Sequence, residues 1–209
     1  MHRVRVKICG ITRLEDAVAA AASGADAIGL VFYPGSPRCI DTDTAAAIIS
    51  ILPPFISKVG LFVNQNASEI ESILRQVSLD YLQFHGEESP DECGRYNKPY
   101  IKSMRMEEKI RLTAEVKKYH GSSCLLLDAH VAGMAGGTGQ TFDWSRIPAS
   151  LNKPIILAGG LTPGNVKTAI TSVRPYGVDV SSGVEKSKGI KDPEKIASFI
   201  REVLTACLP

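Results

Sequence analysis

The sequence predicts one α/β domain spanning residues 1–209, built as a closed (β/α)₈ barrel of the TIM type. Three observations lead to this fold: short β-branched runs alternate with longer stretches of helical spacing, the cycle repeats eight times, and no linker interrupts it. The strand-like runs begin near residues 4, 27, 59, 80, 100, 124, 155 and 177. A doubly wound open sheet is built from the same units and is the alternative fold.

Start signals locate five of the helices that lie between these runs. Residues 12–15 (TRLE) and 68–71 (SEIE) have the pattern of a capping box. In this motif the side chains of the first and fourth residues each accept a hydrogen bond from the other residue's backbone N–H. Ser89-Pro90, Thr162-Pro163 and Asp192-Pro193 each place an N-cap residue before a proline at the first helical position. We therefore expect helices to begin at these five places.

The two faces of the predicted strands differ in polarity, which favours the closed barrel. One face of four strands carries the pairs Lys7 and Cys9, Gln83 and His85, Leu126 and Asp128, and Asp179 and Ser181, while the opposite faces are apolar. Apolar outer faces under helices, with polar groups turned inward, suit a barrel that holds chemistry at its upper end. Closure would also make the last strand the neighbour of the first, so we expect Lys7 to pair with Asp179.

Composition excludes several classes of partner. With 24 Lys plus Arg against 22 Asp plus Glu, the net charge of +2 is too small for a nucleic-acid-binding surface. The five cysteines form neither a C-x-x-C pair nor a zinc spacing, which predicts neither a disulfide framework nor a metal site. The charged N-terminus and the absence of a long apolar stretch predict a cytoplasmic protein without a membrane partner.

In such a barrel the active site lies at the C-terminal ends of the strands, so position alone nominates candidate residues. The chain also carries extra length after the second and sixth strands, in residues 33–38 and 133–139, and long loops in a short fold often have a function. The candidates at the strand ends are Cys9, Arg38, His85, Asp128, Gly159, Gly160, Ser181, Ser182 and Gly183.

Glycine-containing ends on the last two strands predict a phosphate site. Gly159 and Gly160 follow one strand, and Ser181, Ser182 and Gly183 follow the next. Their backbone N–H groups would be unobstructed, and a short helix after the second segment would direct its positive end at an anion. Either segment alone is also explained as a tight turn, but the two together predict phosphate binding.

Cys9 and Asp128 are the candidate proton carriers. A cysteine in a strand is most often a buried, inert hydrophobe. Near Lys7 and facing a polar pocket, however, the Cys9 thiol could be held partly as thiolate and act as a base. Asp128 ends an apolar run, an environment that favours a protonated carboxyl group, although a carboxylate that caps the next element is the alternative.

The remaining polar candidates would bind or orient a ligand. Arg38 lies between turn residues and could clamp a carboxylate bidentately or be an ordinary surface arginine. His85 is more readily explained by a structural or substrate-orienting role than by catalysis. Lys7 and Asp179, on facing strands, are interpreted as a buried pair that orients the pocket, and Gln83 shares the inner face with His85.

Several segments together resemble one known family. They include residues 7–12 (KICGIT), 29–38 (GLVFYPGSPR), 83–86 (QFHG), 136–144 (GGTGQTFDW) and 178–185 (VDVSSGVE), in order and over nearly the whole chain. On these motifs the chain resembles the phosphoribosylanthranilate isomerase family of tryptophan biosynthesis. The resemblance implies a cofactor-free and metal-free Amadori rearrangement of a small phosphorylated substrate, N-(5'-phosphoribosyl)anthranilate, by a monomer or homodimer.

The resemblance also assigns roles to the candidates. It implies that Asp128 is the general acid, that Cys9 is the general base and that Arg38 holds the anthranilate carboxylate. The glycine-containing ends would hold the phosphate, with Lys7, Gln83, His85 and Asp179 around the substrate, and Gly136, Gly137, Thr138 and Gly139 would form a mobile cover. Two other functions remain open: another phosphosugar isomerase or epimerase on the same barrel, and a non-catalytic module that binds a phosphorylated metabolite.

Overall fold

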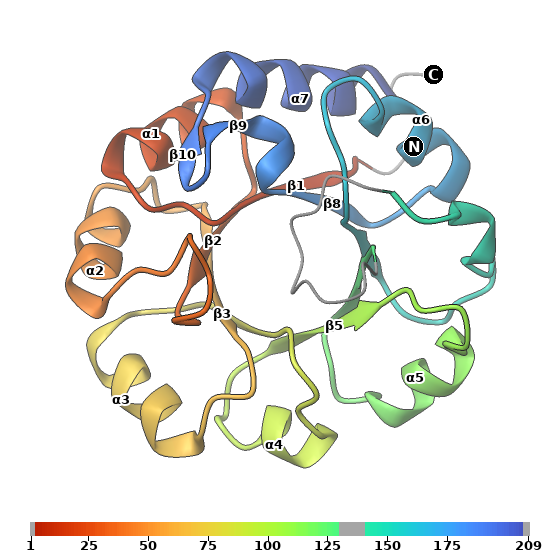
Figure 1. Cartoon of the computed structure of the whole chain (residues 1–209), viewed down its shortest axis with the longest axis horizontal. Helices are drawn as coiled ribbons and strands as arrows, with labels where there is room; N and C mark the ends of the chain where they lie inside the picture. The colour runs from red at the N-terminus through yellow and green to blue at the C-terminus, as the bar shows by residue number, and fades with distance from the viewer. Residues whose placement is uncertain (1–2, 130–140, 207–209) are drawn as a thin grey trace.

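The protein is a closed parallel barrel. The computed structural model describes residues 3–129 and 141–206. Within them eight strands pair in chain order, and the last pairs with the first (Figure 1). The closed barrel predicted from the sequence is confirmed, and the open sheet is wrong. The strands are β1 (Arg5–Cys9), β2 (Ala27–Val31), β3 (Ser57–Phe62), β4 (Tyr81–Phe84), β5 (Tyr100–Arg105), β6 (Cys124–Asp128), β7 (Ile155–Leu157) and β8 (Gly177–Val180).

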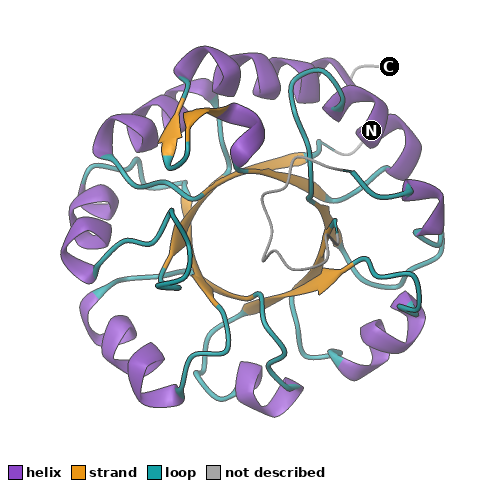
Figure 2. Cartoon of the chain, in the orientation of Figure 1, coloured by secondary structure: helices purple, strands orange, loops and turns teal. Residues whose placement is uncertain are grey.

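Helices surround the barrel on its outer face (Figure 2). Two short 3₁₀ helices and one hairpin complete the described chain, and the hairpin is inserted after β8. The helices are α1 (Leu14–Ser23), α2 (Thr42–Ser50), α3 (Ala67–Gln76), α4 (Pro90–Gly94), α5 (Leu112–Lys118), α6 (Val166–Val173) and α7 (Pro193–Ala206). The 3₁₀ helices are η1 (Trp144–Arg146) and η2 (Ser182–Val184), and the hairpin strands are β9 (Glu185–Ser187) and β10 (Ile190–Lys191).

Two of the five predicted helix starts are confirmed. Ser89 caps α4 in a capping box with Glu92, and the proline that follows Ser89 occupies the first turn. The Asp192 carboxylate accepts hydrogen bonds from the N–H groups of Glu194 and Lys195 at the start of α7. In both cases a side chain satisfies N–H groups that the first turn of a helix leaves without partners.

At the other three places the predicted capping residues are wrong, although α1 and α3 begin close to the predicted positions. The capping box of α3 is formed by Asn66 with Glu69, two residues earlier than predicted, because Asn66 is also an N-cap residue followed three positions later by Glu. The Thr12 hydroxyl does not cap α1 but donates to the Gly189 carbonyl of the β9–β10 hairpin. Helix α6 begins at Val166, since Thr162 is held in a turn by Asn165.

The predicted assignment of inner and outer strand faces is confirmed. Alternate apolar residues of the strands face the helices and join the large hydrophobic core, which includes Ile8, Leu82 and Val178. A separate, smaller cluster fills the barrel interior, and it includes Val59, Leu126 and Ile156. Because strand side chains alternate between faces, the inner positions at the C-terminal ends are left for polar groups.

Barrel closure brings Lys7 and Asp179 together, as predicted. The two residues are register partners between β1 and β8, and the Lys7 Nζ lies 2.9 Å from the Asp179 Oδ1. Both side chains are buried, so each charge depends on the other for stabilisation. In the described part of the chain, none of the helices is long and apolar enough to cross a membrane.

Candidate active site

Cys9 lies inside the barrel at the C-terminal end of β1, and a glycine makes room for it. The Cys9 side chain is buried, with the residue 6% exposed. Its register partner on β2 is Gly29, and a Cβ at that position would lie 2.7 Å from the Cys9 Sγ and 3.1 Å from the Lys7 Nζ. Sequence reasoning missed Gly29, although a glycine inside a strand commonly marks such a close approach.

Burial and the charged neighbours of Cys9 shift the pKa of its thiol. Burial raises the pKa of the thiol, Lys7 lowers it without outweighing burial, and Asp179 raises it again. Burial also opposes the charge on Lys7, but Asp179 and Cys9 outweigh it and raise the Lys7 pKa. Desolvation of the sulfur therefore exceeds the attraction of Lys7 and opposes the partial thiolate expected from the sequence.

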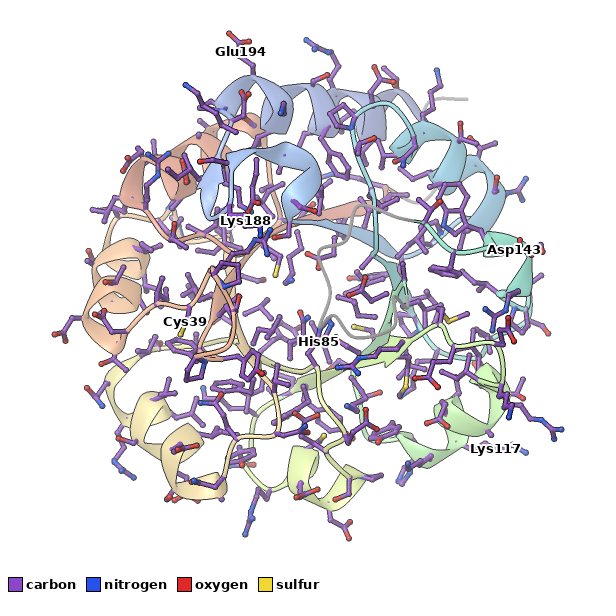
Figure 3. All side chains as sticks on the ribbon, viewed as in Figure 1. Cys39, His85, Lys117, Asp143, Lys188 and Glu194 are labelled. Carbon is purple, nitrogen blue, oxygen red and sulfur yellow. The ribbon has the colours of Figure 1, made fainter. Side chains whose placement is uncertain are left out.

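Asp128 lies at the C-terminal end of β6 and contacts His85. The Asp128 Oδ2 is 3.2 Å from the His85 Nε2, and the His85 Nδ1 is 3.1 Å from the Gln83 Nε2. An amide nitrogen only donates, so this contact favours the tautomer in which Nδ1 accepts and Nε2 donates to Asp128. Figure 3 shows His85 projecting into the barrel opening. The three residues thus form one chain of hydrogen bonds.

Gly159 makes room for the Asp128 carboxyl group, as Gly29 makes room for the Cys9 thiol. Gly159 adopts a left-handed backbone with φ of +81°, and a Cβ there would lie 2.8 Å from the Asp128 Oδ1. Because L side chains rarely adopt this conformation, the position requires glycine for two reasons. Gly159 was predicted for its backbone N–H group, and the structure adds this packing role.

The two segments predicted to hold phosphate lie together. A Cβ at Gly183 would overlap the Leu161 carbonyl oxygen, so the loop after β7 and the start of η2 are in direct contact. The short helix predicted after Ser181 is present as η2, Ser182–Val184. Lys191, which sequence reasoning missed, brings its Nζ within 3.2 Å of the Ser181 carbonyl and within 3.3 Å of the Ser181 hydroxyl.

Arg38 has a partner that the sequence did not predict. Its Nε and Nη2 atoms each lie 2.7 Å from one carboxylate oxygen of Glu185, a bidentate pair. The Lys191 Nζ lies 2.9 Å from the same carboxylate. Burial opposes the charged form of Glu185, but Arg38 and Lys191 outweigh it and lower the Glu185 pKa. Arg38 is therefore held in the structure rather than being a loose surface arginine.

The predicted cover, Gly136, Gly137, Thr138 and Gly139, lies outside the described residues. Among the residues that are described, no group of three or more His, Cys, Asp or Glu side chains could hold a metal ion. The arrangement that remains is a thiol, a carboxyl group and a positively charged cluster at one end of the barrel.

The match to a family model decides which family this is. A model described as N-(5'-phosphoribosyl)anthranilate (PRA) isomerase matches residues 6–202. The chain belongs to the phosphoribosylanthranilate isomerase family. Relatives of the same name include those of Pseudomonas savastanoi, 59% identical over 97% of this chain and 98% of the relative, and Nitrosococcus oceani, 56% identical over 96% and 98%.

Solved structures of phosphoribosylanthranilate isomerases agree with this fold. The Thermotoga maritima protein superposes with a TM-score of 0.86 at 40% identity, covering 97% of this chain and 99% of that one. Monomers generated from the dimeric protein of that organism superpose at 0.81, with 38% identity and the same coverage. A phosphoribosylanthranilate isomerase in complex with reduced 1-(o-carboxyphenylamino)-1-deoxyribulose 5-phosphate superposes at 0.83, with 39% identity and the same coverage.

Proposed function

We propose that the chain isomerises N-(5'-phosphoribosyl)anthranilate to 1-(o-carboxyphenylamino)-1-deoxyribulose 5-phosphate in tryptophan biosynthesis. The observation that carries this proposal is the placement of Cys9 and Asp128. Both are buried at the C-terminal ends of strands of one closed barrel, where barrel active sites lie. Family membership supports the same activity, and a biosynthetic role supports a cytoplasmic location.

The reaction requires one acid and one base, and the site offers both. Asp128 donates a proton to the furanose ring oxygen as the C1'–O bond breaks, and the nitrogen lone pair forms the C=N bond of a Schiff base. The cationic imine acidifies C2', so the Cys9 thiolate removes that proton and gives an enolamine. The enolamine tautomerises to the ketone by protonation at C1' and loss of the proton from the C2' hydroxyl. Proton transfers of this kind typically contribute about 10²- to 10⁴-fold each.

The neighbours of the two proton carriers orient them and the substrate. His85 directs its Nε2 proton at Asp128 and is fixed by Gln83, so the pair holds the carboxyl group in place. Lys7 and Asp179 form a buried ion pair beside Cys9. Gly159, Gly160, Ser181, Ser182 and Gly183 would bind the phosphate, and Arg38 the anthranilate carboxylate. Binding at both anionic ends then orients the reacting carbons between them.

The test is loss of phosphoribosylanthranilate fluorescence. Wild-type protein is expected to turn over this substrate in the presence of a chelator, because the mechanism uses no metal. Cys9→Ala and Asp128→Asn should each lower kcat by at least about 10²-fold, as removal of a proton carrier does. Unimpaired kcat in either variant would contradict the mechanism. If the wild type does not turn over the substrate, the alternative functions remain: another phosphosugar isomerase, or a non-catalytic binding module.

We propose further that the chain forms a homodimer joined through the N-terminal face of the barrel. Phe55, in the loop between α2 and β3, is 96% exposed. It borders a cavity of about 410 Å³ at the starts of the strands, which Tyr81 and Ile156 also line. An aromatic side chain so exposed beside an apolar-lined hollow is typical of an interface, and the related Thermotoga maritima protein is described as dimeric.

A further inference from the structure

Arg38 is placed to bind two carboxylates at once. A guanidinium group presents two edges of paired N–H donors, one from Nε and Nη2 and the other from Nη1 and Nη2. Glu185 occupies the first edge, with both contacts at 2.7 Å. Among the described residues, the contacts of Arg38 side-chain nitrogens are confined to that edge. The second edge is therefore available for a ligand.

Lys191 makes this arrangement compatible with an anionic ligand. A lone Glu185 carboxylate would cancel the charge of Arg38 and repel a second carboxylate nearby. The Lys191 Nζ, on a side chain that is 0% exposed, lies 2.9 Å from the Glu185 Oε1. Two cations and one anion leave the cluster with a net charge of +1. The attraction for an anion is thus kept while the Arg38 guanidinium is held in a fixed plane.

The backbone around the cluster fixes its position. Glu185 and Lys191 are paired across the β9–β10 hairpin. The Lys191 N–H donates to the buried Asp16 carboxylate on α1, and the Lys195 Nζ donates to the Glu185 carbonyl. A Cβ at Gly10 would overlap the aliphatic part of Arg38, so the arginine stem lies directly on the loop after Cys9. The Arg38 side chain is therefore held both along its stem and at its Nε–Nη2 edge.

We propose that Glu185, neutralised by Lys191, is a positioning residue that aims the Nη1–Nη2 edge of Arg38 at the ring carboxylate of the substrate and so sets selectivity for a carboxylated arylamine. This proposal rests on the proposed function above. Glu185 acts through Arg38 and does not touch the reacting carbons. Because Glu185 restricts Arg38 before the ligand arrives, the arginine side chain loses less conformational entropy when the ligand binds.

The test compares two ligands by titration calorimetry: reduced 1-(o-carboxyphenylamino)-1-deoxyribulose 5-phosphate and its counterpart without the ring carboxylate. Glu185→Gln keeps the size of the side chain but replaces one acceptor oxygen with a donor. We expect it to weaken binding of the carboxylated ligand by about tenfold. Binding of the counterpart should stay within about twofold of wild type, and KM should rise about tenfold with kcat little changed.

Two further variants keep the test decisive. Glu194→Gln is the matched control, since Glu194 lies on α7 far from the barrel opening (Figure 3) and should leave both ligands unaffected. Glu185→Asp keeps the charge but shortens the reach, and we expect an intermediate loss of selectivity of about threefold. If Glu185→Gln does not fold, as judged by circular dichroism, Glu185→Asp decides the question.

The outcomes separate the two proposals. Unchanged selectivity in a folded Glu185 variant, or an equal loss for both ligands, would overturn the positioning role. Tighter binding of the carboxylated ligand would also overturn it, because Glu185 would then compete with the ligand for Arg38. Failure of the wild type to bind either ligand would instead refute the proposed function, whatever the Glu185 variants do.

Discussion

At the scale of single residues, the charges around Cys9, the proposed base, shift the pKa of its thiol. Burial raises the pKa of the thiol above its ordinary value, Lys7 lowers it and Asp179 raises it. Only the thiolate removes a proton, so below this pKa the active fraction grows with pH, about tenfold for each unit. We expect kcat/KM to rise with pH through the neutral range and to level off only above the ordinary pKa of a cysteine.

The two charged neighbours should move this profile in opposite directions. Lys7→Met removes the cause that lowers the pKa of Cys9, so its rising limb should shift to higher pH than in wild type. Asp179→Asn removes a cause that raises the pKa, so its limb should shift to lower pH. The measurement is kcat/KM across pH for both variants. Identical profiles for the three proteins would argue against Cys9 as the titrating base.

Gly29 shows how a residue without a side chain contributes to a site. Gly29→Ala would place a Cβ 2.7 Å from the Cys9 Sγ, so the chain must shift, and overpacking of this kind typically costs about 1–3 kcal/mol. Gly94→Ala is the control, because a Cβ there meets nothing within 4 Å. Denaturant unfolding should show a loss of stability for the first variant and none for the second; equal stabilities would mean that the barrel absorbs the methyl group freely.

At the scale of elements, two residues near the start of α3 are candidates for its N-cap. The sequence pattern favoured Ser68 with Glu71, whereas the structure uses Asn66 with Glu69. Asn66→Ala should therefore lower the free energy of unfolding by about 1 kcal/mol, because it removes the acceptor for the Glu69 N–H. Ser68→Ala should change it by no more than a few tenths, since its hydroxyl only contacts the Asn66 side chain. Chemical denaturation of both variants measures this, and the reverse order would restore the sequence-based boundary.

The β9–β10 hairpin connects several segments of the fold through side-chain hydrogen bonds. Its residues 185–191 (EKSKGIK) carry four charged side chains. In the structure Thr12, Asp16 and Arg38, from three other segments, are bonded to it. The hairpin therefore links the loops after β1 and β2 to the end of β8, and it carries Lys191 into the site.

At the scale of the whole molecule, the exposed Phe55 provides the test of the homodimer. Phe55→Asp would place a charge at the proposed interface, where burial without a partner is costly, so the dimer should dissociate. Light scattering coupled to size-exclusion chromatography should give twice the monomer mass for wild type and the monomer mass for the variant. A dimeric variant would place the interface elsewhere, and a monomeric wild type would contradict the homodimer. Because the proposed active site lies at the opposite end of the barrel, activity should persist in the variant.

The closed barrel itself and the residues facing its interior could be predicted from the sequence. Strand periodicity predicts which side chains share a face, and eight repeated units leave few topologies. The sequence therefore predicted the inward direction of Lys7, Cys9, Gln83, Asp128 and Asp179. These are local or repeated signals, and each can be read within one strand or one unit of the chain.

Only the tertiary structure decided which distant residues meet. Arg38 and Glu185 are 147 positions apart, and Lys191 reaches their cluster across a hairpin whose sequence has no distinctive pattern. The protonation of Cys9 was likewise undetermined, because it depends on how completely the fold removes the thiol from water. Periodicity records which way a side chain points, whereas pairing energies and desolvation depend on what the folded chain brings alongside it.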